Sequence, residues 1–204
     1  MKNIAIALMC TILATGAAMA QEQFTFGPKI GVDYTHYWGK DVGHGGVLNY
    51  QIGLFMEYRI NNKFSVAPEF VFAAQGGKYE DVYRIPEIGK IEVNVTDHAN
   101  YINVPVMLKY YVIPELSIDF GPQIGFNIYS KYTAKAKDSS IEFKETYDEK
   151  EETKNVDFGF GLGVTYNLAK DVFVQGRYTM GVTKTFNYGN DKNGNAQIAI
   201  GYRF

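Results

Sequence analysis

The stretch VDFGFGLGVTYNL, residues 156–168, alternates without a break between large apolar residues and small or polar ones. Because successive side chains of a β-strand point to opposite faces of the sheet, this alternation predicts a strand with one apolar face. The other face carries Gly159, Gly161 and Gly163. A strand that faces water normally uses larger polar residues, since glycine weakens a strand. The glycine face therefore needs an explanation other than contact with solvent.

The same alternation recurs along the chain, and no helical period of useful length competes with it. The expected strands are 24–37, 49–60, 63–75, 100–112, 116–130, 156–168, 171–184 and 195–204. Short turns at 61–62, 113–115 and 169–171 alternate with long connections. The long connections are 38–48, 76–99, 131–155 and 185–194. In an up-and-down meander this places all short turns at one end, as in outer-membrane barrels.

The glycine face distinguishes a membrane barrel from a soluble one, because the two classes bury opposite faces. The interior of an eight-stranded barrel is just wide enough for side chains to fill it. Large residues such as Phe70, Phe158 and Phe160, repeated over eight strands, would not all fit there. The sequence therefore predicts an all-β, eight-stranded antiparallel up-and-down transmembrane β-barrel with glycine inside. Ten strands are the alternative, if 76–99 and 131–155 pair further.

Charged residues on the glycine face would lie in the lumen, where an unpaired charge is costly. Strand alternation assigns five basic and five acidic residues to this face. They are Lys29, Arg59, Lys109, Arg177, Arg203, Asp33, Glu57, Glu69, Asp119 and Asp157. Their balance predicts a lumen filled by paired charges, whereas an excess of one sign would indicate an ion-selective pore. The wet rims are the alternative place for Lys29, Asp157 and Arg203.

The first twenty residues have the features of a secretory signal peptide. Lys2 precedes the short apolar run 4–14, and Ala18-Met19-Ala20 fits a cleavage site. We expect cleavage before Gln21, which leaves 21–204 as one barrel domain. The only cysteine, Cys10, falls in the signal, so the domain has no disulfide or thiolate metal site. A formal net charge of −2 gives no indication of nucleic-acid binding.

The chain ends in QIAIGYRF, which places Ile198, Ile200, Tyr202 and Phe204 on one face and finishes on an aromatic residue. This ending resembles the terminal signal by which outer-membrane barrels are recognised for assembly. It implies the barrel-assembly machinery as a partner.

Three further segments extend the resemblance. They are FSVAPEFVFAAQGGK (64–78), YINVPVMLKYYV (101–112) and GPQIGFN (121–127). They resemble the PorT-like, or "porin family", outer-membrane β-barrel domain, over essentially the whole mature chain. The size is similar to that of the OmpA and OmpX barrels, whose lumens are filled. The resemblance implies an integral outer-membrane protein of a Gram-negative cell, in contact with lipid and lipopolysaccharide, and it brings no catalytic motif.

No catalytic, cofactor or metal site is expected. His36, His44 and His98 fall in or beside the expected loops, and no Gly-x-Ser-x-Gly motif occurs. A Ser-His-acid site assembled in space, which would make the protein a lipid hydrolase, is a remote alternative. A metal pair of His36 and His44 is similarly weak, since no third ligand accompanies it.

The segment 131–155 is the strongest candidate for binding. Thirteen of its twenty-five residues are charged, which fits a solvated loop. Ile141, Phe143 and Tyr147 indicate a hairpin above the membrane, whose edge would recruit an extended protein partner. Its carboxylates could also take up cations that bridge lipopolysaccharide, and KIEVNV (90–95) is a second strand-like piece. We expect a monomeric, non-enzymatic structural or surface-interaction scaffold. A narrow porin or a transport or secretion accessory is the alternative.

Overall fold

A computed structural model describes residues 23–39, 45–85, 89–138, 143–187 and 189–204. The described chain forms ten strands, and every pairing is antiparallel. They are β1 (Phe24–Trp38), β2 (Val47–Arg59), β3 (Phe64–Gln75), β4 (Lys78–Ile85), β5 (Gly89–Ile113), β6 (Leu116–Ala136), β7 (Lys144–Asp148), β8 (Val156–Asn167), β9 (Val172–Gly181) and β10 (Lys192–Tyr202).

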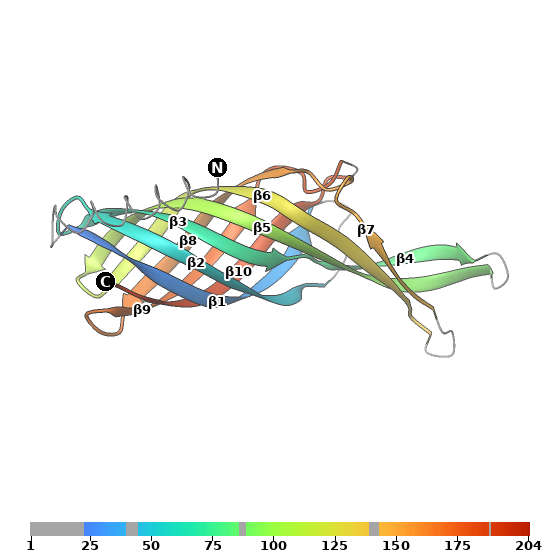
Figure 1. The fold of residues 1–204 in the computed structure, drawn as a ribbon, viewed down its shortest axis with the longest axis horizontal. Helices are drawn as coiled ribbons and strands as arrows, with labels where there is room; N and C mark the ends of the chain where they lie inside the picture. Colours follow the sequence, from blue (N-terminus) through green and yellow to red (C-terminus); the bar gives the residue numbers. More distant parts are fainter. Residues whose placement is uncertain (1–22, 40–44, 86–88, 139–142, 188) are drawn as a thin grey trace, which may run out of the picture.

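Eight strands close into a ring in the order β1-β2-β3-β5-β6-β8-β9-β10, with β10 pairing back to β1. The short turns after β2, β5 and β8 lie at the same end of the barrel as the C-terminus (Figure 1). In outer-membrane barrels this end faces the periplasm and the opposite end faces outward. No helix long and apolar enough to cross a membrane occurs in the described part of the chain.

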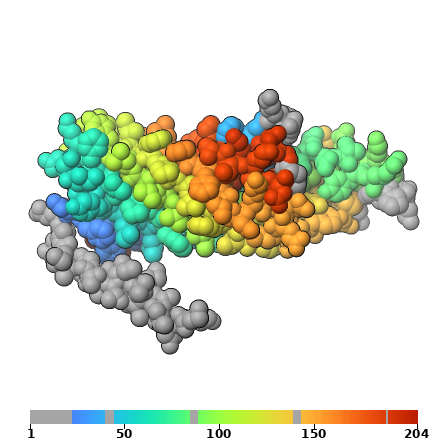
Figure 2. All heavy atoms as spheres, turned by 90° about the horizontal axis from the view of Figure 1, so that it is seen from above, coloured from blue at the N-terminus to red at the C-terminus, as the bar shows by residue number. Residues whose placement is uncertain are grey.

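The other two strands extend the wall beyond the ring. β4 pairs with the first part of β5, and β7 pairs with the last part of β6. The resulting four-stranded sheet, β4-β5-β6-β7, projects from the end opposite the short turns (Figure 1). Figure 2 shows the green atoms of β4 and the start of β5 standing clear of the barrel. We call these four segments the projecting sheet.

Side chains of β8 show which face meets lipid. Phe158, Phe160 and Leu162 are 48%, 47% and 58% exposed, whereas Gly159 and Gly161 between them are buried. Large apolar residues therefore cover the outside of the ring, and glycine and polar residues occupy its interior. This is the expected inversion of a soluble protein, because the outer face of a membrane barrel contacts hydrocarbon.

The outward face of β5 marks the limits of the apolar band. From Ile102 to Val112 every outward residue is apolar or tyrosine, and from Asn100 back to Thr96 it is polar. Ten residue steps of a tilted strand span roughly 25 Å, the height of the apolar band in outer-membrane barrels. The membrane-spanning segment of β5 is therefore 102–112, and the projecting sheet lies outside the bilayer.

Two glycines show why the inner face requires small residues. A Cβ atom on Gly121 would lie 2.0 Å from the carbonyl oxygen of Val106 on β5. One on Gly27 would lie 1.7 Å from the carbonyl oxygen of Tyr202 on β10. Real Cβ atoms do not approach backbone this closely, so any side chain here would force neighbouring strands apart.

The projecting sheet covers its own apolar face. Ile91, Val93, Val95, Ala134 and Ala136 are at most 6% exposed. Longer side chains from the same sheet and its border pack over these small residues, namely Tyr79, Tyr83, Tyr132 and Phe143. The sheet therefore has a small core of its own and does not depend on the barrel wall alone.

The predicted eight-stranded antiparallel barrel is confirmed. The prediction that 76–99 and 131–155 are long loops was partly wrong. Much of each segment is strand, in β4, β5, β6 and β7. The predicted strand piece 90–95 lies within β5. These segments alternate like the barrel strands but carry charges on one face, and that polarity suits a sheet in water. The expected signal peptide lies outside the described residues.

Replacing Phe160 with Arg places a charge on the lipid face near mid-depth, opposite Pro122 on β6. We expect this to lower the free energy of unfolding in lipid vesicles by about 2–4 kcal/mol. Leu168→Arg, one residue after the end of β8 and next to the short turn, should cost at most about 1 kcal/mol. Urea titration followed by tryptophan fluorescence measures both. Equal costs at the two depths would contradict the assignment of faces.

Candidate functional site

The centre of the lumen is occupied by an ion-paired cluster. Lys29 Nζ on β1 lies 2.6 Å from Glu69 Oε2 on β3. Arg177 on β9 donates two hydrogen bonds to the same carboxylate, at 3.0 and 2.6 Å. All three residues are at most 6% exposed. Lys29 also donates to Gln175 Oε1 at 3.0 Å, which fixes the ammonium between two strands.

A second cluster lies nearer the short turns. Glu57 on β2 accepts hydrogen bonds from Ser65 at 2.8 Å, from Tyr111, and from Lys109 at 3.1 Å. Arg203 approaches Glu57 at 3.9 Å and lies over the ring of Phe173. Burying an unpaired carboxylate has a large desolvation cost. These donors offset that cost for Glu57 inside the barrel.

The three lumenal aspartates are held by neutral groups. Asp119 accepts hydrogen bonds from Ser117 at 2.6 Å and from Thr165 and Gln175. Asp33 accepts one from Gln51 at 2.8 Å. Asp157 accepts one from Thr183 at 2.6 Å and one from Asn193 at 3.1 Å. Each aspartate therefore relies on neutral polar side chains that reach it inside the barrel.

The structure places nine of the ten expected lumen charges in buried positions. It brings Lys29, Glu69 and Arg177 into one cluster, and Glu57, Lys109 and Arg203 into another. Arg59 is half-buried near the short turns, with its guanidinium 4.4 Å from the centre of the Tyr111 ring.

Two loops meet at the outward end of the barrel. Thr153 forms an isolated bridge with Phe186, and Lys154 N donates to the carbonyl of Thr185 at 2.8 Å. Phe186 is 4% exposed, and its ring meets that of Tyr37 edge to face at 5.4 Å. The segment after β7 and the segment after β9 are thereby joined across the mouth.

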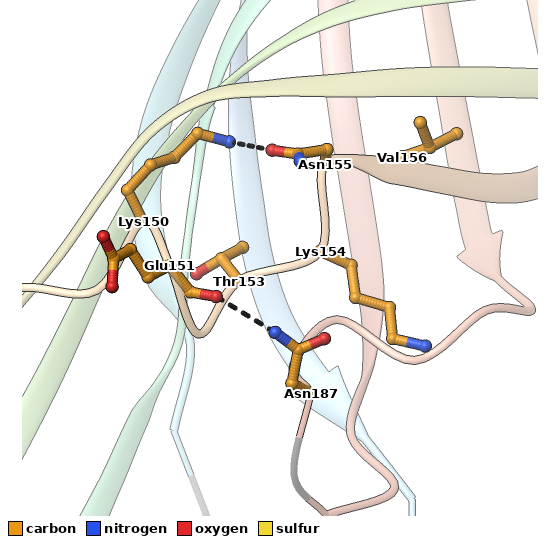
Figure 3. Close-up of a pocket in the computed structure, with 7 residues that line it drawn as sticks. All are labelled: Lys150, Glu151, Thr153, Lys154, Asn155, Val156 and Asn187. Atoms are coloured by element: carbon orange, nitrogen blue, oxygen red, sulfur yellow. Dashed lines mark hydrogen bonds between the residues drawn. The ribbon is translucent and has the colours of Figure 1, made fainter.

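These loops also form an open hollow of about 490 Å³ (Figure 3). Lys150 Nζ donates to Asn155 Oδ1 at 2.5 Å, and Asn187 Nδ2 donates to the carbonyl of Glu151 at 3.0 Å. The lining side chains thus hold the loops together. They include no serine, histidine or cysteine, and the hydroxyl of Thr153 donates to the carbonyl of Glu149 at 2.9 Å.

Sequence reasoning missed Asp97, a buried acid beyond the apolar band. It is 2% exposed, and neither carboxyl oxygen receives a hydrogen bond of good geometry. Burial, with the negative charges of Glu149 and Asp191, raises the pKa of Asp97 to about 8, although Tyr37 acts in the opposite direction. Asp97 and the buried residue Asn103 are an even number of residues apart and therefore share one face of β5. A predicted strand that began before residue 97, and not at residue 100, would have placed Asp97 on the inner face.

The histidines do not assemble a catalytic or metal site in the described ranges. His36 Nε2 lies 3.3 Å from the hydroxyl of Tyr178, and its ring stacks on Tyr34. His98 lies on the outer face of β5 opposite Lys131, and His44 lies outside the described residues. Among those residues, no three His, Cys, Asp or Glu side chains are grouped to hold a metal ion.

The residues of the expected assembly signal share the lipid-facing side of the C-terminal strand. Ile198, Ile200, Tyr202 and Phe204 are 63%, 47%, 45% and 68% exposed. The ring of Phe204 packs against Phe26 at 5.6 Å, which anchors the chain end on β1.

Residues 19–187 match the family model described as "Outer membrane protein beta-barrel domain". The chain belongs to this family. Membership places it in the outer membrane, with its apolar band in the bilayer. Comparison with curated protein sequences gives no match.

Solved structures show the same small barrel. The attachment invasion locus protein Ail of Yersinia pestis aligns with a TM-score of 0.51 and 14% identity, over 89% of this chain and 99% of Ail. Neisserial surface protein A, NspA, aligns with a TM-score of 0.50 and 12% identity, over 88% of this chain and 97% of NspA. At such identity the similarity establishes the fold alone.

The buried position of Asp97 predicts a pH dependence of stability. The folded protein retains the proton up to about pH 8, whereas the unfolded chain releases it near the ordinary aspartate pKa of 3.8. Stability should therefore fall as pH rises between these values and then level off. Asp97→Asn removes the titration, so the wild type should lose stability relative to this variant. Urea unfolding in vesicles across that range measures the difference, and a constant difference would contradict the prediction.

Proposed function

We propose that the protein is a non-enzymatic scaffold of the outer membrane, with a filled lumen, which acts through structural or surface interactions of its outward end. The projecting sheet recruits an extended segment of an extracellular protein by adding a strand to β7. The observation that carries this proposal is the open edge of β7 at the border of a sheet that stands outside the bilayer.

Backbone hydrogen bonds identify the open edge. The carbonyl of Phe143 accepts from Ala136 N, and Glu149 N donates to the carbonyl of Ser130. Since successive residues of a strand alternate in direction, the N–H and C=O groups of Lys144, Thr146 and Asp148 point away from β6. Within the described residues β7 pairs with β6 alone, so this edge offers a strand-sized template.

The opposite edge of the sheet is partly blocked. Lys78 on β4 exchanges backbone hydrogen bonds with Gly45, at 2.9 and 3.2 Å. Further along, the outward N–H of Val82 donates to Asp81 Oδ1 at 2.7 Å. Natural sheets use such features to prevent unwanted pairing, and their position on β4 favours β7 as the binding edge.

The apolar face of the sheet is less suited to binding, because Tyr79, Tyr83 and Phe143 already cover it. Charged side chains on the other face, such as Glu80, Glu92 and Lys137, pair with one another near the surface. Recognition through backbone groups therefore suits this sheet better than recognition through an apolar patch.

The remaining expectations belong to the same proposal. They are a PorT-like "porin family" affiliation, cleavage of residues 1–20 to leave the domain 21–204, recognition of the C-terminal strand by the barrel-assembly machinery, and a monomeric state. Ail has been crystallised with the heparin analogue sucrose octasulfate. A sulfated polysaccharide is therefore a reasonable control ligand, which should not compete with an added strand.

The alternative of a narrow porin or a transport or secretion accessory requires a water path. The buried clusters around Glu69 and Glu57 and the contact of Phe186 with Tyr37 argue against one. A lipid hydrolase would require a Ser-His-acid geometry, and none of the hydrogen bonds of His36 fits it.

Strand addition is tested by removing one outward N–H group. We would select binders from a phage-displayed library of random peptides against the protein in lipid nanodiscs. Thr146→Pro should weaken the selected peptides roughly tenfold, because proline removes a donor from the edge. Thr146→Val is the matched control, since it loses the same hydroxyl and keeps the N–H. Equal binding to Thr146→Pro and wild type would contradict the proposal.

A further inference from the structure

The five residues of β7 are all exposed, and they alternate between the two faces of the projecting sheet. Lys144, Thr146 and Asp148 lie on the face that carries the charged pairs of the other three strands. Glu145 and Tyr147 lie on the face that carries the small core. A strand added to this edge would place its own side chains opposite these five. The edge therefore selects a partner by side chain as well as by backbone.

On the charged face, Lys144 has no acid to balance it. Its direct partner on β6 is Lys135, and like charges directly opposite each other destabilise a sheet. Glu80 and Glu92 on this face already pair with Lys137. Lys144 itself takes part in no ion pair in the described part of the chain. An acid opposite Lys144 on an added strand would supply the missing attraction.

Asp148, on the same face, does not supply this acid. It is four residues from Lys144 along the strand, a distance of about 13 Å. It also lies directly opposite Lys131, and its Oδ1 accepts the backbone N–H of Lys150 at 2.8 Å. Asp148 therefore has a cation and a donor beside it already, and the position opposite it on an added strand requires no charge.

On the core face, Tyr147 and Glu145 set two further requirements. The ring of Tyr147 stacks on Tyr132 at 5.1 Å, and 38% of the residue is still exposed at the edge. Glu145 has the buried Ala134 as its partner on β6 and therefore no cation opposite it. Because the backbone groups of Thr146 point outward, Glu145 and Tyr147 would form the non-hydrogen-bonded pairs with an added strand, where side chains are closest. An aromatic residue there would continue the stack, and a base would pair with Glu145.

We infer that β7 selects an antiparallel protein segment with the pattern aromatic-x-base-acid. The aromatic residue lies opposite Tyr147, x opposite Thr146, the base opposite Glu145 and the acid opposite Lys144. The inference rests on the proposed function, strand addition at β7, and names the chemistry of the partner. Antiparallel pairing continues the order of the rest of the sheet. A base in place of the acid would line up three cations with Lys144 and Lys135, which the sheet would reject.

Selection from the random peptide library against the protein in nanodiscs should enrich this pattern. One enriched peptide is then compared, by fluorescence anisotropy, with a counterpart that has Lys at the acidic position. Wild type should bind the acidic peptide roughly fivefold more tightly than the basic one. Lys144→Glu should reverse this preference, because it turns attraction into repulsion.

Lys90→Glu is the matched control for overall charge. Lys90 is exposed on the same face of the sheet, but it lies on β5 opposite Arg84, away from β7. Lys90→Glu should therefore keep the wild-type preference for the acidic peptide. The shift in gel mobility on boiling verifies that each variant forms a closed barrel.

Thr146→Pro separates this inference from the proposal on which it rests. It should weaken both peptides, because it removes the outward N–H whichever side chain lies opposite. If it weakened neither peptide, strand addition would fail and the inference with it. If it weakened both while wild type bound them equally, strand addition would stand and the inference would be overturned. Failure to enrich the pattern, or an equal reversal in Lys90→Glu, would also overturn it.

Discussion

Glu69 lies inside the barrel and accepts hydrogen bonds from Lys29 and Arg177, which come from two other strands of the ring. Burying these two cations and one carboxylate is tolerable because both cations pair with Glu69 at hydrogen-bonding distance and Lys29 also donates to Gln175. This cluster of Lys29, Glu69 and Arg177 occupies the centre of the lumen. It fills the space that the glycine-rich inner face leaves open and ties strands that are distant in sequence. Under the proposed function, interactions with other molecules are left to the outside wall and the outward end.

The barrel could be predicted because its signals repeat on every strand. The alternation around Phe158, Phe160 and Leu162 fixes the faces, and glycine on the inner face indicates which side is crowded. The same alternation predicts which charged residues face the lumen. The alternation does not predict which of these charges form ion pairs. The register between distant strands depends on ring closure and on bulges such as the one between Asn100 and Tyr101.

The outward end was less predictable for physical reasons. A strand that leaves the bilayer no longer needs an apolar outer face, so the ends of β5 and β6 look like charged loops in sequence. The environment of Asp97 could not be predicted, because its neighbours Glu149 and Asp191 come from connections far along the chain. Single-strand periodicity places Asp97 on the inner face once β5 is extended to Gly89, but it does not bring Glu149 and Asp191 close to it.

Single-channel conductance of the refolded protein in a planar bilayer tests the central claim, that paired charges close the lumen. The account predicts silence or rare small flickers for the wild type. Removing the cation with Arg177→Ala, or the acid with Glu57→Ala, should then raise the frequency of openings, because the remaining charges would draw in water. Stable, reproducible steps in the wild type, with a size that both substitutions alter, would mean that these side chains line a water path. That result would contradict the filled barrel and assign the protein to the pores.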